Sequence, residues 1–181
     1  MKLFYCLLFL VLAIDIDAQN MQDKKSFLSL DGAHIFSNYV GRFPKMGWHS
    51  DCDEIEIDYH TLPGEKASMM IPSTQSGNIV TAEFNFLNRD IIGKKIIFKG
   101  KYKYQEAHDA KIDFSIVLHT NYGRYIAQNT SIKCNGEQDW KEFYVEMPLE
   151  RTEKFHFRIA CTSIVTLWVT DCQVLVDGQS F

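Results

Sequence analysis

The chain has 181 residues, of which 46% are hydrophobic and 23% charged, and its formal net charge is −4 at pH 7. A chain of this length and composition can bury the core of one globular domain. The small negative charge provides no basic surface for nucleic acid or for an anionic membrane. We therefore expect no nucleic-acid partner and no membrane insertion.

The N-terminus carries a short apolar segment, residues 3–14, after Lys2. This segment is too short to span a bilayer and is typical of a cleaved secretory signal. Ile16 and Ala18 occupy the −3 and −1 positions of a cleavage site. We predict a signal peptide over residues 1–18 and a single domain over residues 19–181, in a protein that is secreted, periplasmic or part of the cell envelope.

Four cysteines follow the predicted signal peptide. An even number in an exported chain permits two disulfides, and four cysteines allow three pairings. They can equally be buried thiols, because unpaired cysteine packs as a small hydrophobic residue. The sequence leaves both alternatives open for Cys52, Cys134, Cys161 and Cys172.

Alternating apolar and polar residues dominate the chain after residue 50, whereas residues 19–50 show no regular period. The alternation predicts strands over 54–60, 79–86, 95–104, 111–119, 124–133, 141–147, 154–161 and 167–178. Lys99, Lys101 and Lys103 are expected on the solvent side of the third of these strands. No segment of comparable length has a helical period. The fold class predicted is therefore all-β, an antiparallel β-sandwich.

The last predicted strand, LWVTDCQVLVDG, contains a carboxylate within an apolar run. Because an unpaired buried charge is costly, we expect a β-bulge at Thr170–Asp171 that turns the carboxylate outward. Backbone amides or water are its expected partners. The residues expected to face the core are Leu167 and Val169 before the bulge, and Cys172, Val174 and Val176 after it.

Five segments occur in an order that is similar to one known module: PKMGW, GEKASMMI, IIGKKIIFKGKYK, QDWKEFYVEMPL and LWVTDCQVLVDG. Together they resemble the galactose-binding-like jelly-roll domain of carbohydrate-binding modules, over about residues 29–178. The similar variant precedes erythromycin-esterase-like or C-terminal-processing-type peptidase domains in Bacteroidetes-type exported proteins. The resemblance implies a noncatalytic jelly-roll that binds sugars.

The same resemblance implies a structural calcium ion where the N-terminal strand meets the last strand. Asp171 and Asp31 are its candidate ligands, with main-chain oxygens completing the six to eight that calcium takes. The family pattern has an acidic pair here, and only Asp171 matches it because Thr170 occupies the neighbouring position. No other cofactor is expected.

A sugar site needs an aromatic ring for stacking and polar groups for the sugar hydroxyls. With a bulge at Asp171, Trp168 points outward, and we expect it to lie beside Arg158 on the preceding strand. The NYG turn supplies further rings and amides at a rim. The candidate ligand contacts are Trp168, Tyr125, Tyr122, Arg158, Gln128 and Asn121.

Enzyme signatures are absent from the sequence, which has no GxSxG, HExxH or GxxxxGK[ST] motif. We therefore expect a noncatalytic module that binds carbohydrate or another cell-envelope ligand. The alternative is a structural or protein-interaction module that docks a cell-envelope protein. A hydrolase on the same scaffold is a third hypothesis, because different functions are grafted onto shared folds.

Overall fold

The computed structural model describes residues 28–36, 47–52, 54–64, 66–72, 79–85, 93–120, 123–149 and 154–180. The predicted signal peptide therefore lies outside the described residues. Every regular secondary-structure element within these ranges is a β-strand, which confirms the all-β prediction. No helix that could span a membrane occurs in the described residues. The strands are β1 (Ile35–Phe36), β2 (Gly47–Ser50), β3 (Glu56–Asp58), β4 (Ser68–Ile71), β5 (Val80–Asn85), β6 (Lys95–Thr120), β7 (Gly123–Pro148), β8 (Lys154–Val176) and β9 (Gln179–Ser180).

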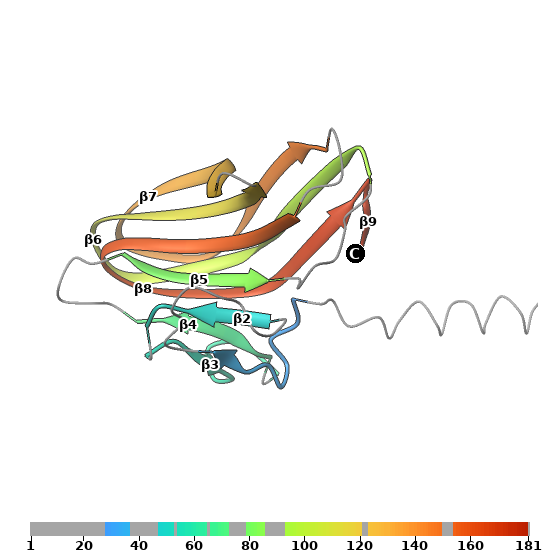
Figure 1. Ribbon diagram of the computed structural model, residues 1–181. Coiled ribbons are helices and arrows are strands. Elements are labelled where there is room, and N and C mark those ends of the chain that lie inside the picture. The colour runs from blue at the N-terminus through green and yellow to red at the C-terminus, as the bar shows by residue number, and fades with distance from the viewer. Residues whose placement is uncertain are drawn as a thin grey trace, which may run out of the picture.

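Three strands, β6, β7 and β8, are 23 to 26 residues long and bend sharply at the same end of the molecule (Figure 1). The sequence predicts two shorter strands in place of each of them. Each long strand continues through the segment that was expected to separate its two halves. Each of these strands thereby contributes one half to each layer of the sandwich.

The bends divide the hydrogen-bonded strands into two packed sheets. The β4 sheet consists of residues 138–148 of β7, 95–105 of β6 and 166–176 of β8, followed by β4 and β3. The β5 sheet consists of residues 123–134 of β7, 110–119 of β6 and 154–162 of β8, followed by β5, β2 and β1. All pairs are antiparallel except β1 with β2. The predicted antiparallel sandwich is confirmed.

The bend of β6 depends on two non-glycine residues in the left-handed region, Glu106 at φ 55° and Asp109 at φ 47°. The pairing register of β6 shifts on both sides at this point. Ala107 and Ala110 face inward at the bend and are 0% and 3% exposed. Small side chains are suited to this position because the two sheets converge there.

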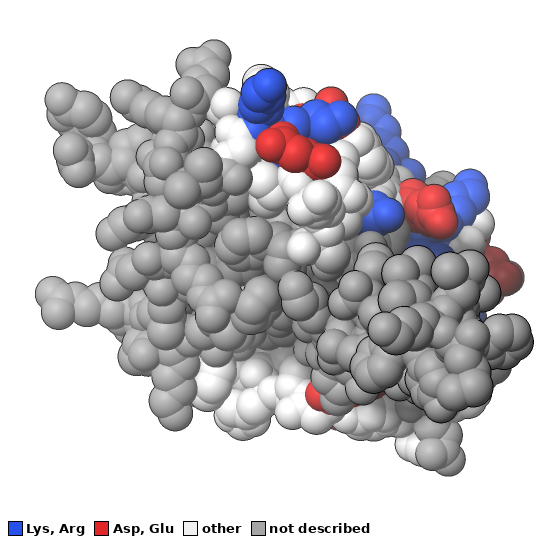
Figure 2. Space-filling view, turned by 90° about the vertical axis from the view of Figure 1, so that its right-hand side faces the viewer, with Lys and Arg blue, Asp and Glu red and all other residues white. Residues whose placement is uncertain are grey.

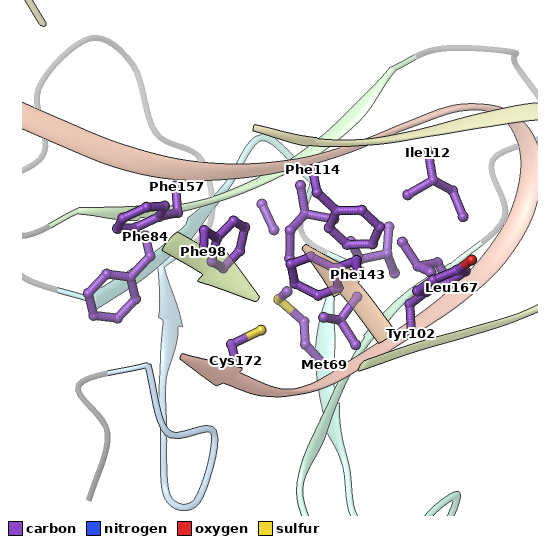
Figure 3. Close-up of a cluster of buried hydrophobic side chains, with 14 of the residues drawn as sticks. Met69, Phe84, Phe98, Tyr102, Ile112, Phe114, Phe143, Phe157, Leu167 and Cys172 are labelled. Atoms are coloured by element: carbon purple, nitrogen blue, oxygen red, sulfur yellow. The ribbon is translucent and has the colours of Figure 1, made fainter. Parts of the chain in front are cut away.

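The core lies between the two sheets and consists of the inward-facing residues of both (Figure 3). Phe114 of the β5 sheet stacks on Phe143 of the β4 sheet, with ring centroids 3.8 Å apart. Phe98 of the β4 sheet meets Phe157 of the β5 sheet at 4.8 Å. These contacts between sheets account for the apolar face that period-two alternation predicts in each strand.

Four short strands, β1, β2, β4 and β9, were not expected from the sequence, and β2 and β4 contribute side chains to the core. β2 lies in the segment 19–50 that shows no period, and it pairs with β5 through Trp48, which is 1% exposed. β4 pairs with the second half of β8 and places Met69 in the core. A strand of four residues is too short to show its period in sequence.

None of the four cysteines is in a disulfide. Cys134, Cys161 and Cys172 are buried and Cys52 is partly buried against the core. Burial raises the pKa of the Cys134 thiol to about 11 and also raises the pKa of the other two buried thiols. Of the two alternatives left open by the sequence, the structure shows packed thiols.

The predicted β-bulge is confirmed at Asp171. Between Lys99 and Lys101 of β6 the opposing residues on β8 are Gln173 and Thr170, so β8 holds one extra residue there. Asp171 occupies the left-handed region at φ 51°, as asparagine and aspartate do more often than other side chains. Its carboxylate turns outward, and its described partner is Lys101, whose Nζ lies 3.1 Å away in an ion pair that the sequence did not predict.

Gly100 tests the spacing of the β4 sheet. A Cβ at this position would lie 2.7 Å from Phe143 Cε1 and 2.9 Å from the Thr170 carbonyl oxygen. We expect Gly100→Ala to lower the free energy of unfolding by about 1–3 kcal/mol, as overpacked sites do. Urea unfolding monitored by tryptophan fluorescence measures the change.

The control is Gly136→Asn, because Gly136 has φ 69° and nothing lies within 4 Å of its added Cβ. Asparagine tolerates the left-handed region, so this variant should unfold near the wild-type midpoint. Equal midpoints for Gly100→Ala and wild type would contradict the close packing of β6 on Phe143.

Candidate functional site: the outer face of the β5 sheet

The outer face of the β5 sheet carries a row of polar side chains across four strands. Ser115 of β6 lies opposite Arg158 of β8, which lies opposite Glu83 of β5, which lies opposite His49 of β2. Their inward-facing neighbours belong to the core, so period-two alternation places these four on the outer face. The row is the centre of the candidate site.

Polar residues on this face are shielded from solvent to an unusual degree. Ser115 is 1%, His49 2%, His156 0% and Thr81 7% exposed. The outer face of an antiparallel sandwich ordinarily contacts water, and buried polar groups are retained where they have partners or a function. The row is therefore largely shielded from solvent, and its partly accessible groups are Arg158 and Glu83, 29% and 14% exposed.

Glu83 is the electrostatic centre of the row. Its Oε1 atom lies 3.4 Å from His156 Nε2 and 3.8 Å from Arg158 Nε. Arg158 Nη2 donates to Thr81 Oγ1 at 3.4 Å. The Arg158 guanidinium and the Glu83 carboxylate are 29% and 14% exposed, so both are partly accessible at the outer face, and their opposite charges balance each other.

Two buried polar atoms of the row, Ser115 Oγ and Arg158 Nε, have no hydrogen-bond partner among the described residues. A buried polar group without a partner costs about 1–3 kcal/mol. The partly exposed guanidinium of Arg158 could donate to a bound hydroxyl, and the Glu83 carboxylate could accept from one. This arrangement is suited to a ligand rich in hydroxyl groups.

The polar face continues onto the edge strand β7. Asn129 Nδ2 donates to Ser131 Oγ at 3.0 Å, and the Ser131 hydroxyl donates to Asp113. Lys111 Nζ lies 2.9 Å from Asp113 Oδ2. The lysine and the aspartate neutralise each other, as Arg158 and Glu83 do in the row.

An aromatic group borders the opposite end of the row. Phe36 of β1 stacks on His49 with ring centroids 5.1 Å apart, and His34 meets the Phe36 ring edge-on at 4.8 Å. Phe36 is partly buried. The face is thus polar at its centre and aromatic at the β1 edge.

Of the six candidate contacts from the sequence, Arg158 lies in the row. Gln128 is exposed on β7, opposite Ile116 of the same sheet, and Tyr125 lies on β7 opposite Leu118, although its side chain is outside the described residues. Asn121 and Tyr122 also lie outside the described residues. The sequence missed Glu83, His156 and Ser115, because alternation marks outward positions without showing which of them are shielded from solvent.

Trp168 does not lie beside Arg158. Both are on β8, but the strand crosses between the sheets, so Trp168 lies on the outer face of the β4 sheet. Its outward direction agrees with the expected bulge, yet it is only 9% exposed and its indole Nε1 donates to Asp58 Oδ2 at 2.8 Å. The side chain links β8 to β3, and its ring is not open to a ligand.

Asp58 gathers hydrogen bonds at the start of the loop between β3 and β4. Burial alone would raise the pKa of this carboxyl, but hydrogen bonds from the Thr61 hydroxyl, the His60 amide and the Trp168 indole together hold it below its ordinary value. A depressed native pKa means that the ionised form stabilises the fold. That stabilisation is present above about pH 4 and is lost as the pH falls further.

We expect Trp168→Phe to lower the free energy of unfolding by about 1 kcal/mol at pH 7, because one hydrogen bond to a carboxylate is lost. The difference from wild type should shrink at pH 3, where Asp58 is protonated in more of the molecules. Urea unfolding at both pH values measures it. Trp140→Phe is the control, because Trp140 has no described contact with Asp58 and its effect should not depend on pH. A pH-independent loss for Trp168→Phe would contradict the Asp58 interaction.

Asp31 and Asp171 do lie close together, as the calcium hypothesis requires. Both line a cavity of about 230 Å³ between residues 28–31, the start of β4 and the bulge of β8. Their donor set does not fit calcium, because Lys66 also lines the cavity and the Lys101 ammonium already pairs with Asp171. No group of three metal-ligating acidic, histidine or cysteine side chains occurs in the described parts of the chain. Calcium takes six to eight oxygens and usually several carboxylates.

We therefore expect neither EDTA nor millimolar CaCl2 to change Tm by more than about 1 °C, since a stabilising ion would raise it by mass action. Differential scanning fluorimetry provides the measurement, with MgCl2 at equal ionic strength as control. A larger rise with CaCl2, absent in Asp31→Asn, would show that the cavity is a calcium site.

The fold is shared with solved structures of carbohydrate-binding modules. The xylan-binding domain CBM22-1 of Paenibacillus barcinonensis Xyn10C superposes with a TM-score of 0.51 at 10% identity, covering 72% of this chain and 85% of that one. A xylan-binding domain of CBM22 gives 0.54 at 11% identity, covering 74% and 89%. The CBM22-1–GH10 modules of Clostridium thermocellum Xyn10B, complexed with xylohexaose, give 0.54 at 12% identity, covering 71% and 26%. No protein-family model and no curated protein matches the sequence.

At these identities the similarity establishes the fold. The chain has the β-sandwich architecture of carbohydrate-binding modules, which confirms the jelly-roll, galactose-binding-like class implied by the sequence resemblance.

Proposed function

We propose that this chain is an exported, noncatalytic module that binds carbohydrate on the outer face of the β5 sheet. The observation that carries the proposal is the polar row of Ser115, Arg158, Glu83 and His49 on an outer sheet face, in which Arg158 and Glu83 remain partly exposed. Sugars are neutral and bear many hydroxyls, each able to donate and accept. The row offers a donor and an acceptor side by side, with their charges balanced.

The fold shared with xylan-binding domains supports this proposal and makes xylan the first ligand to test. Arg158 and Glu83, which are partly exposed, would hydrogen-bond ligand hydroxyls. Export follows from the predicted signal peptide at residues 1–18.

Arg158→Met tests the proposal because it removes the guanidinium and keeps most of the aliphatic chain. We expect binding at this face to weaken at least about tenfold, since charged hydrogen bonds contribute about 1.5–3 kcal/mol each. The measurement is affinity gel electrophoresis in soluble xylan, glucan, mannan and galactan, followed by calorimetry with the matching hexasaccharides.

Lys141→Met is the matched control, since it also replaces a cation of a β-strand with methionine but lies outside the row, on an exposed position of β7. It should leave binding unchanged. Two results would rule out the β5-sheet site: no glycan retards the wild-type protein, or Arg158→Met and wild type give superimposable isotherms.

A further inference from the structure

Several polar side chains on the outer face of the β4 sheet are more open to solvent than those of the β5-sheet row. One cross-strand row there consists of Tyr144 of β7, Lys99 of β6 and Gln173 of β8. Their neighbours Phe143, Phe98 and Val174 belong to the core, so the row faces outward. Tyr144 is 48% exposed, whereas Ser115 and His49 of the β5-sheet row are almost fully buried.

The Tyr144 ring is held in a fixed orientation. Its hydroxyl donates to Glu146 Oε2, and this carboxylate lies 3.3 Å from Lys95 Nζ. The hydrogen bond to Glu146 raises the pKa of the Tyr144 hydroxyl, which therefore stays protonated and continues to donate. An exposed ring that is already ordered loses little conformational entropy when a ligand stacks on it.

Two of the lysines near the ring are in ion pairs. Lys95 pairs with Glu146 and Lys101 pairs with Asp171. At the end of the sandwich seen in Figure 2, lysine and arginine side chains lie next to aspartate and glutamate side chains. A surface with this balance favours a neutral ligand over a strongly charged one.

The row leads from the Tyr144 ring to the cavity between residues 28–31 and the bulge. Gln173 is the third residue of the row and also lines that cavity, which has a volume of about 230 Å³. Two strand spacings separate Tyr144 from Gln173, or about 10 Å. The other polar lining residues are Ser29, Asp31, Lys66, Thr170 and Asp171.

From this juxtaposition we propose a second carbohydrate-binding surface on the outer face of the β4 sheet, for a neutral oligosaccharide. One sugar ring stacks on Tyr144, Lys99 and Gln173 hydrogen-bond its hydroxyls, and an adjoining sugar enters the cavity beside Asp31 and Asp171. The cavity is smaller than the about 300–1,000 Å³ of drug-sized ligand pockets and suits one sugar unit. The surface is independent of the β5-sheet site, and with both sites the module can hold two glycan chains on opposite faces.

The experiment is calorimetry with neutral xylo-, gluco-, manno- and galacto-hexasaccharides on four proteins: wild type, Tyr144→Ala, Arg158→Met and the double variant. We expect two sites per wild-type molecule, one in each single variant and none in the double variant. In the Arg158→Met background, Gln173→Ala should weaken the remaining site about tenfold.

Two further variants separate stacking from a general surface effect. Tyr144→Phe keeps the ring but loses the hydroxyl that anchors it, so affinity should fall less than in Tyr144→Ala. Ile164→Ala truncates another side chain of the exposed surface, 36% exposed at the bend of β8, and should change neither affinity nor site number. Thermal melting of each variant establishes that it is folded, which is expected because Tyr144 contributes no side chain to the core.

The possible results are distinguishable. If Tyr144→Ala matches wild type in both backgrounds, the second surface is overturned while the β5-sheet site stands. If Tyr144→Ala removes all binding and Arg158→Met removes none, the second surface is supported and the β5-sheet proposal fails. If no hexasaccharide binds wild type, or if Ile164→Ala weakens binding as much as Tyr144→Ala, the second surface is overturned.

Discussion

The bend shared by β6, β7 and β8 is the constraint on which the rest of this structure depends. Because each long strand supplies both sheets, the half that lies in the β4 sheet packs its inward face against the halves that lie in the β5 sheet, as Phe98 packs on Phe157 and Phe143 on Phe114. The bend is possible because Glu106 and Asp109 take left-handed conformations and two alanines fill the narrow space between the sheets. Larger residues there would separate the sheets and open the aromatic core.

The bend also gives the molecule two outer faces with different chemistry. On the β5 sheet, the polar side chains of the row are largely buried, and Ser115 Oγ lacks a hydrogen-bond partner among the described residues, which is energetically costly. On the β4 sheet, charged residues are close to half exposed and form ion pairs such as Lys95 with Glu146. Surface ion pairs contribute little stability, so the second face can be altered without unfolding the protein.

Much of the fold could be predicted from the sequence because period-two alternation reports directly which residues face the core. Alternation in the predicted strands 111–119 and 154–161 places Phe114, Phe157 and Ile159 on the apolar face, and all three are fully buried. The continuity of each long strand could not be predicted, since residues 105–110 are polar and resemble a turn. For the same reason Trp168 and Arg158 were expected side by side, although the strand that carries both passes from one sheet to the other. The burial of polar residues on an outer face depends on tertiary packing and leaves no periodic signal in the sequence.

The carboxylate of Asp171 shows how one local irregularity serves both the core and the surface. The extra residue shifts the register of β8, so that Val169 and Cys172 both face inward although three positions separate them. Aspartate is suited to the left-handed bulge position, and the turn of the backbone carries its side chain out to Lys101. Thr170, immediately before it, donates to the Ala67 carbonyl oxygen and fixes β8 to the segment that precedes β4. The same bulge thereby forms one wall of the cavity beside Gln173, so the feature that keeps the core apolar also shapes the open face of the β4 sheet.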